Sequence, residues 1–175
     1  MSPRVRRLAL TAHVAASVGW VGAVVTFIAI AAVGLTADDE ATVRGAYLVM
    51  DSAARLVLVP LALLSLLTGV VQSLGSPWGL LRHHWVVVKL LITVLATAVL
   101  LVYLRTFAAM AAAAADSATG LGAVRNPSPL IHALFALVLL LAATLLGVVK
   151  PRGTTWIGRR AAQRRPDQLP AAPVG

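Results

Sequence analysis

Long apolar segments alternate with short polar segments along this chain. Three segments carry no charged side chain, and they cover 8–37, 56–81 and 126–149. A fourth, over 83–107, is interrupted only by Lys89 and Arg105 near its two ends. A helix needs about 20 residues to cross the hydrocarbon of a bilayer, which is about 30 Å thick. The pattern therefore predicts four transmembrane helices, over about 8–35, 53–74, 84–107 and 128–149.

The four segments are apolar on every face, which separates them from membrane strands. Strands of a membrane barrel alternate apolar and polar residues at period two. Helices satisfy their own backbone hydrogen bonds in lipid, so they are the remaining solution. The predicted fold class is all-α, an antiparallel four-helix transmembrane bundle formed by residues 1–150 as one domain. The first segment resembles a secretory signal peptide in its basic start, but it is about twice as long as such a peptide allows.

The distribution of charge predicts how the bundle is oriented. With four spans, both termini and the loop between spans two and three lie on one side, and five of the six acidic residues lie on the other. Basic residues favour the cytoplasmic side of a membrane, so both termini are predicted to be cytoplasmic in a bacterial plasma membrane. The basic side holds Arg4, Arg6, Arg7, Arg82, Lys89, Lys150, Arg152, Arg159, Arg160, Arg164 and Arg165.

Composition narrows the range of partners and chemistry. The chain is 59% hydrophobic and 12% charged, against about 25% charged in soluble domains. It contains no cysteine, which excludes disulfides and thiolate metal sites. The net charge of +9 is concentrated around the spans and in the Pro- and Ala-rich tail over 151–175. We expect this tail to be disordered near its end and to favour an anionic inner leaflet. It lacks the interleaved aromatic residues of a nucleic-acid site.

Several local features predict how the spans begin, bend and pack. Pro60 should kink span two, and Asp51 and Arg55 are spaced to form an ion pair on a helix. Residues 126–129 combine a polar cap candidate with prolines, so helix four should begin there. Small residues recur every four positions in span one and favour the close approach of another helix. They are Ala15, Gly19 and Ala23, and Gly69 is expected to act in the same way in span two. A homo-oligomer is left open.

Lys89 is a lone cation within an apolar span, and an ionisable group at membrane depth points to function by default. Lys89 lies a few residues into span three, and His13 lies a similar distance into span one from the same side. At about 1.5 Å per residue, both reach about 6 to 10 Å beyond the boundary. We therefore expect Lys89 to face His13 inside the bundle, although a lysine at this depth can also extend to the interface.

Other polar residues near these two form stripes along single helix faces. One stripe in span one contains His13, Ser17 and Trp20, and further stripes occur in spans two and three. Either the stripes converge on one pocket on the cytoplasmic side, or each hydroxyl bonds a carbonyl of its own helix. His84 lies at the mouth of the same side, whereas His132 begins span four on the opposite side. The stripes in spans two and three are Ser65, Thr68 and Gln72, and Thr93 and Thr97.

Two short patterns carry a resemblance to known membrane families. Residues 13–22 read H-x6-W-x-G, and residues 85–90 read W-x3-K-L. The first pattern resembles the opening helix of HemJ-type protoporphyrinogen oxidases and of CopD-like copper-resistance membrane proteins. The second resembles the third helix of the HemJ-type family, in which a first-helix histidine and a third-helix lysine are the functional pair. The resemblance assigns those roles to His13 and Lys89. Overall, the chain resembles uncharacterised four-helix integral membrane proteins of actinobacteria.

Three functional hypotheses follow. In the first, His13, Trp20, Lys89 and His84 form a cytoplasmic-side pocket for haem b or a porphyrin, used in redox or haem-related chemistry. His13 is then the candidate metal ligand, because a neutral imidazole can ligate haem iron. In the second, His13 and Lys89 line a hydrated path in a CopD-like metal or small-solute transport protein. In the third, the chain is a structural or accessory membrane subunit without catalysis.

Overall fold

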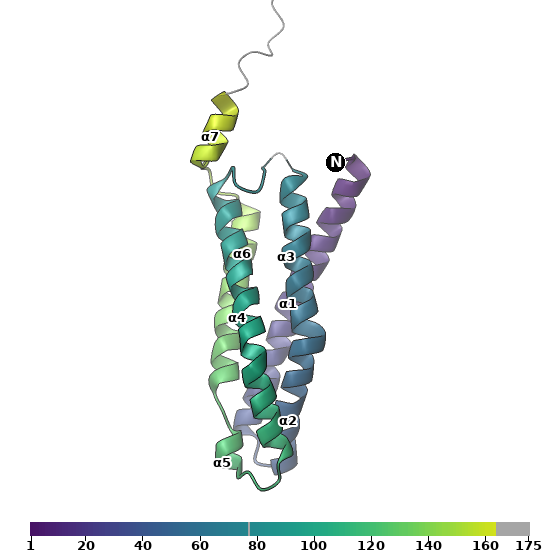
Figure 1. Cartoon of the computed structure of the whole chain (residues 1–175), viewed down its shortest axis with the longest axis vertical. Helices are drawn as coiled ribbons and strands as arrows, with labels where there is room; N and C mark the ends of the chain where they lie inside the picture. The colour runs from purple at the N-terminus through teal and green to yellow at the C-terminus, as the bar shows by residue number, and fades with distance from the viewer. Residues whose placement is uncertain (77, 164–175) are drawn as a thin grey trace, which may run out of the picture.

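The computed structural model describes residues 1–76 and 78–163, and these residues are almost entirely helical (Figure 1). The helices are α1 (Pro3–Thr36), α2 (Glu40–Ala53), the π-helical segment η1 (Ala54–Leu58), α3 (Val59–Leu74), α4 (His84–Ala115), α5 (Leu121–Val124), α6 (Ser128–Val149) and α7 (Trp156–Gln163).

Four helical segments are long and apolar enough to cross a membrane. They are Pro3–Thr36, Glu40–Leu74, His84–Ala115 and Leu121–Val149. The predicted all-α four-helix bundle is therefore confirmed, and the chain is a multi-pass integral membrane protein. The N-terminus, the turn after α3 and the start of α7 lie at one end, here called the terminal end (Figure 1). The opposite end, here called the loop end, holds residues 37–39 and 116–127.

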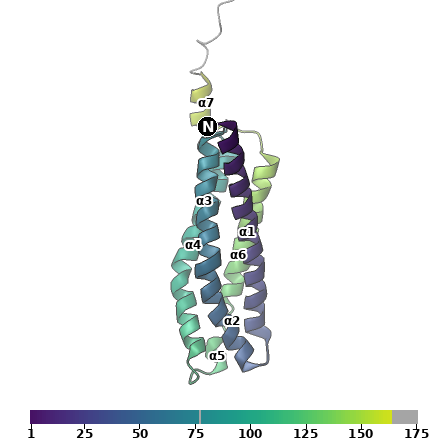
Figure 2. The same cartoon turned by 90° about the vertical axis from the view of Figure 1, so that its right-hand side faces the viewer.

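The long helices form a ring in which each packs against its neighbours. α1 packs against α2, α3 and α6, and α4 packs against the same three helices. α1 and α4 therefore lie across the bundle from each other (Figures 1 and 2). A residue of α1 and a residue of α4 that face inward can meet at the centre.

The second membrane-crossing segment is one long helical path interrupted by a π-helical turn. The structure extends the predicted second span toward the loop end by α2, which runs into η1 and α3. Pro60 lies two residues after the end of η1, so the irregular turn lies where the proline disturbs regular helical bonding. The predicted pair of Asp51 and Arg55 is confirmed, with Nε 3.0 Å from Oδ1.

Caps define the ends of several helices. Asp39 caps α2 by accepting a hydrogen bond from the backbone N–H of Thr42 at 2.8 Å. α6 begins at Ser128, as residues 126–129 predict, and the side chain of Asn126 accepts from the Ser128 N–H at 2.9 Å. α6 ends where Lys150 adopts a left-handed conformation with φ of 46°.

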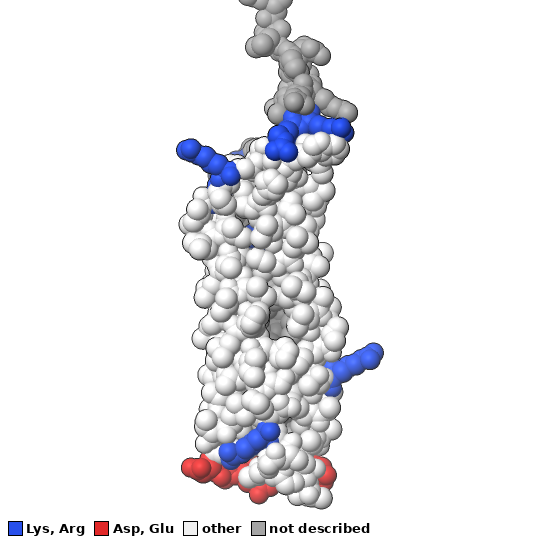
Figure 3. Space-filling model, turned by 90° about the vertical axis from the view of Figure 1, so that its left-hand side faces the viewer, with Lys and Arg blue, Asp and Glu red and all other residues white. Residues whose placement is uncertain are grey.

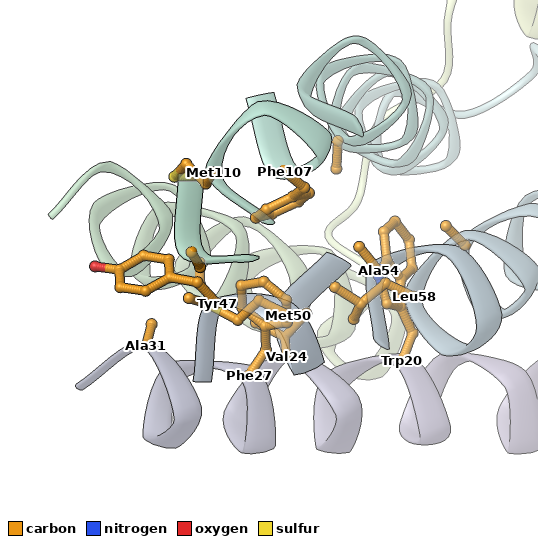
Figure 4. Close-up of a cluster of buried hydrophobic side chains, with 14 of the residues drawn as sticks. Trp20, Val24, Phe27, Ala31, Tyr47, Met50, Ala54, Leu58, Phe107 and Met110 are labelled. Carbon is orange, nitrogen blue, oxygen red and sulfur yellow. The ribbon is translucent and has the colours of Figure 1, made fainter. Parts of the chain in front are cut away.

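The hydrophobic core is concentrated toward the loop end (Figure 4). Trp20, Val24 and Phe27 of α1 pack with residues of α2, η1 and α4, and Phe27 meets the Phe107 ring edge-on at 5.2 Å. The phenol of Tyr47, 1% exposed, donates to the Asn126 carbonyl at 3.1 Å and accepts from its N–H at 2.7 Å. The loop end is thus closed by packing and by hydrogen bonds.

Two arginines close the loop end further. Arg44 of α2 donates to the carbonyls of Ala114 in the last turn of α4 and of Asp116 and Thr119 after it. Arg125 donates to the carbonyls of Leu35 and Ala37 at the end of α1, at 2.9 and 2.6 Å. Leu35 and Ala114 lie in the last turns of α1 and α4, where carbonyls have no partner within the helix, so the guanidinium groups satisfy them.

The acidic residues that the structure describes lie at the end of the bundle where the sequence predicts them. The acidic side chains gather at the loop end, whereas basic side chains lie at both ends (Figure 3). After α6, Thr155 donates to the carbonyls of Arg82 and Leu81 through its N–H and its hydroxyl. These bonds place α7 at the terminal end. The sequence does not predict this helix, because its segment is too short to establish an apolar periodicity. The expected disorder at the end of the tail, with Arg164 and Arg165, lies outside the described residues.

Candidate functional site

His13 of α1 and Lys89 of α4 face each other in the terminal half of the bundle. The Nζ of Lys89 lies 3.5 Å from Nε2 of His13, and both side chains are partly buried. The predicted approach of Lys89 to His13 is therefore confirmed. Because α1 and α4 lie across the ring from each other, the two side chains bridge the centre of the bundle.

Hydrogen bonds from α3 fix the orientation of the His13 ring. Nδ1 lies 3.2 Å from the carbonyl oxygen of Ser65 and 3.2 Å from the hydroxyl of Thr68. A carbonyl oxygen can only accept, so we assign the ring proton to Nδ1. The lone pair of the neutral imidazole is then on Nε2, directed toward the ammonium group of Lys89.

Two glycines make room for this pair. A Cβ atom at Gly69 of α3 would lie 3.0 Å from Cε1 of His13, and one at Gly147 of α6 would lie 3.2 Å from Nζ of Lys89. The sequence predicts that Gly69 allows close packing of helices. In the structure the space beside Gly69 holds the imidazole ring, so this glycine serves the site itself.

Of the polar stripes, the one on α3 converges on His13, whereas the one on α4 does not. Ser65, 5% exposed, also bonds the hydroxyl of Ser17 at 2.9 Å. Thr93 and Thr97 each donate to the carbonyl four residues earlier on their own helix. The stripes of spans one and two therefore converge on His13. Local bonding to a carbonyl four residues earlier occurs at Thr68 as well as at the threonines of span three.

The same polar face of α3 continues toward the terminal end. Gln72 lies one turn beyond Thr68, and its Oε1 is buried without a hydrogen-bond partner among the described residues. Buried polar atoms are rarely left unpaired. A polar group of a ligand or a water molecule is therefore expected at this atom.

Lys89 has no acidic partner in the part of the chain that the structure describes. The ion pairs there are Arg44 with Glu40 and Arg55 with Asp51, both on the helix that begins at the loop end. A cation within a membrane bundle is costly unless a partner compensates its charge. The charge of Lys89 is thus available to an anion from outside the chain.

The two other predicted site residues lie apart from the pair. Trp20, 3% exposed, lines an apolar cavity nearer the loop end. His84 is exposed at the start of α4, where its ring lies beside Gly153. Among residues 1–76 and 78–163, no hydrogen bond joins either side chain to His13 or Lys89, and no three His, Asp or Glu side chains could hold a metal ion together.

The cavity beside Trp20 is a second feature, and the sequence does not predict it. It has a volume of about 420 Å³ and lies between α1, α4 and α6. His132 lines its polar corner together with Tyr103, and their ring centroids are 4.4 Å apart.

A scan against protein-family models, a search of curated proteins and a search of solved structures find no match to this chain. A function for the chain therefore has to be argued from the chemistry of its sites.

Proposed function

We propose that this membrane protein binds an amphiphilic anion at its terminal end, with a carboxylate of that ligand held by Lys89 and His13. The observation that carries the proposal is the contact between two basic groups at membrane depth, with no carboxylate of the described residues paired with Lys89. An anion placed between them would compensate the charge of Lys89. Lys89 would donate hydrogen bonds to the carboxylate, and His13 would donate as well when the ligand enters as the acid and passes its proton to Nε2.

The porphyrin class indicated by the resemblance supplies such carboxylates on an apolar ring. Haem would fit poorly with His13 as its axial ligand in this arrangement. Nζ of Lys89 lies 3.5 Å from Nε2 of His13, the nitrogen that would ligate iron. The carboxylates of a porphyrin, rather than its metal, match the pair. Haem b as the cofactor stays a prediction, and so does a role in haem-related chemistry.

Conduction of ions or solutes through the bundle has weaker support. A path beginning at Gln72 and His13 would have to continue past Trp20, Val24 and Phe27, which are packed in the core. Location in a bacterial plasma membrane, with the terminal end in the cytoplasm, rests on the distribution of basic residues.

Binding of porphyrins to the purified full-length protein in lipid nanodiscs tests the proposal. The probes are protoporphyrin IX and its dimethyl ester, which keeps the ring and removes both negative charges. We expect Lys89→Met to weaken binding of the acid by about tenfold or more, the range for a hydrogen bond to a charged group. Binding of the ester should be unchanged.

Lys150→Met is the matched control, because Lys150 is an exposed cation at the same end of the bundle, 5.7 Å over the Trp78 ring. It should leave the affinity for both probes unchanged. Equal affinities of acid and ester, or an unaltered affinity in Lys89→Met, would contradict the proposal and favour a structural or accessory role. A Soret shift of added haem that His13→Ala abolishes would instead favour axial ligation.

A further inference from the structure

The apolar cavity between α1, α4 and α6 is closed on one side and open on the other. Its closed wall includes Trp20, Phe27 and Leu58, which are 3%, 3% and 5% exposed. Its rim includes Leu95 of α4 and Phe135 of α6, which are 57% and 70% exposed. The opening therefore lies between α4 and α6, and Figure 3 shows a hollow at mid-height on one face of the molecule.

This opening faces the bilayer rather than water. It lies between the charged ends of the molecule, along the loop-end half of α6 and the middle of α4. The part of α6 that lines it runs from Pro129 to Leu139, a length of about 15 Å at 1.5 Å per residue. A molecule dissolved in lipid can reach the cavity sideways, without crossing an aqueous phase.

Tyr103 and the exposed His132 form a polar corner of the cavity, and the buried indole of Trp20 also lines it. The corner offers a hydrogen-bond acceptor. Nδ1 of His132 lies 2.8 Å from the carbonyl oxygen of Ser128, so we assign the ring proton to Nδ1. The hydroxyls of Tyr103 and Ser128 are hydrogen-bonded to each other. Nε2 of His132 then carries a lone pair and has no hydrogen-bond partner among the described residues.

We propose that this cavity binds a membrane-soluble hydroquinone, a flat ring that carries a phenolic hydroxyl and an apolar tail. The aromatic side chains of Trp20, Phe27, Tyr103 and Phe107 suit the faces and edges of a ring. The phenolic hydroxyl donates to Nε2 of His132, and the tail leaves through the opening between α4 and α6. Among the described residues, no Asp, Glu, Lys or Arg side chain lines the cavity, which disfavours an ionised headgroup.

A phospholipid acyl chain is the competing occupant, and it differs from a hydroquinone in one decisive respect. An acyl chain fills apolar volume but has no hydroxyl to donate to His132. A hydroquinone site should therefore bind a ligand with a free hydroxyl more tightly than the same ligand without one, and this preference should depend on His132. An acyl-chain site should show neither property.

The experiment uses the full chain in phosphatidylcholine nanodiscs under argon, with decylhydroquinone and its dimethyl ether as probes. The chain has four tryptophans, and Trp78, Trp85 and Trp156 are replaced by phenylalanine so that Trp20 alone reports. We expect decylhydroquinone to quench Trp20 with an affinity about fivefold higher than that of the ether, the range for one hydrogen bond between uncharged groups.

His132→Phe keeps a ring beside Tyr103 and removes the acceptor, so it should lower the hydroquinone affinity to that of the ether. Ala136→Phe fills the cavity and should abolish binding of both probes. His84→Phe, at the terminal end, is the matched control and should change neither affinity. Three results would each overturn the proposal. They are no quenching by either probe, equal affinities of the two probes for the protein that keeps His132 and Ala136, and a hydroxyl preference that survives His132→Phe.

Discussion

Gly69→Ala tests whether the space beside Gly69 exists to hold the His13 ring. The added Cβ would lie 3.0 Å from Cε1 of His13, closer than side-chain carbons normally approach. The ring must then move, and its Nδ1 already lies 3.2 Å from both of its partners on α3. A shift of a few tenths of an ångström therefore breaks at least one of these hydrogen bonds.

The magnitude follows from two opposing effects. Replacing glycine by alanine within a helix gains about 1 kcal/mol from backbone propensity. Loss of hydrogen bonds to His13 costs about 1 kcal/mol each, and more if a buried group is left without a partner. Gly22→Ala in α1 is the matched control, because nothing lies within 4 Å of its added Cβ. We expect Gly69→Ala to be about 1 to 2 kcal/mol less stable than the control relative to the parent protein.

Apparent free energies of unfolding in mixed dodecyl sulfate and dodecyl maltoside micelles measure this difference. The same two substitutions are then made in a His13→Ala background, which completes a double-mutant cycle. Without the imidazole ring, Gly69→Ala should stabilise the protein as Gly22→Ala does. The reasoning is refuted if Gly69→Ala stabilises the parent protein as much as the control, or if its penalty remains after His13 is removed.

Further predictions concern the loop end. Tyr47→Phe leaves the N–H and carbonyl of Asn126 without their shared partner, so it should cost about 1 to 3 kcal/mol of unfolding free energy in the same micelle titration. Arg125→Gln removes the donor to the end of α1 and should increase amide hydrogen exchange of residues 36–39 without altering the far-ultraviolet circular dichroism. Hydrogen bonds from Thr42 lower the pKa of Asp39, and those from Ala118 and Thr119 lower the pKa of Asp116. Their contribution to stability should be complete above about pH 4 and be lost as the pH falls through the lowered pKa values, as a pH series of thermal unfolding would show.

Much of the fold could be predicted because hydropathy reports membrane spans directly. The depth of His13 and Lys89 could also be counted along each span, since a helix advances a fixed distance per residue. Trp20 shares the face of His13 but lies seven residues further along, about 10 Å away, so it lines the cavity instead. His84 precedes Lys89 by five residues, which places it about 140° around the helix.

The remaining features depend on how helices meet, which one sequence does not reveal. Gly69 and Gly147 are visible as small residues, but only the packed bundle shows which side chains fill the space beside them. The cavity also depends on how the helices pack, because its walls come from helices far apart in the chain. The predicted span two begins at about residue 53 because the charged residues of α2 lower its hydropathy, whereas its buried side chains, Val43, Tyr47 and Met50, follow a helical period.

The closure of α1 by Arg125 has a consequence for how the protein is assembled during synthesis. The arginine donates to carbonyls 88 and 90 residues earlier in the chain. Ribosomes deliver the first hairpin to the membrane well before this loop emerges. Until then, the carbonyls of Leu35 and Ala37 have only water as a partner. With the terminal end in the cytoplasm, as proposed, α1 and α2 enter the membrane before the segment that carries Arg125 is translocated. A nascent chain arrested after α4 should therefore remain open to protease at residues 37–39.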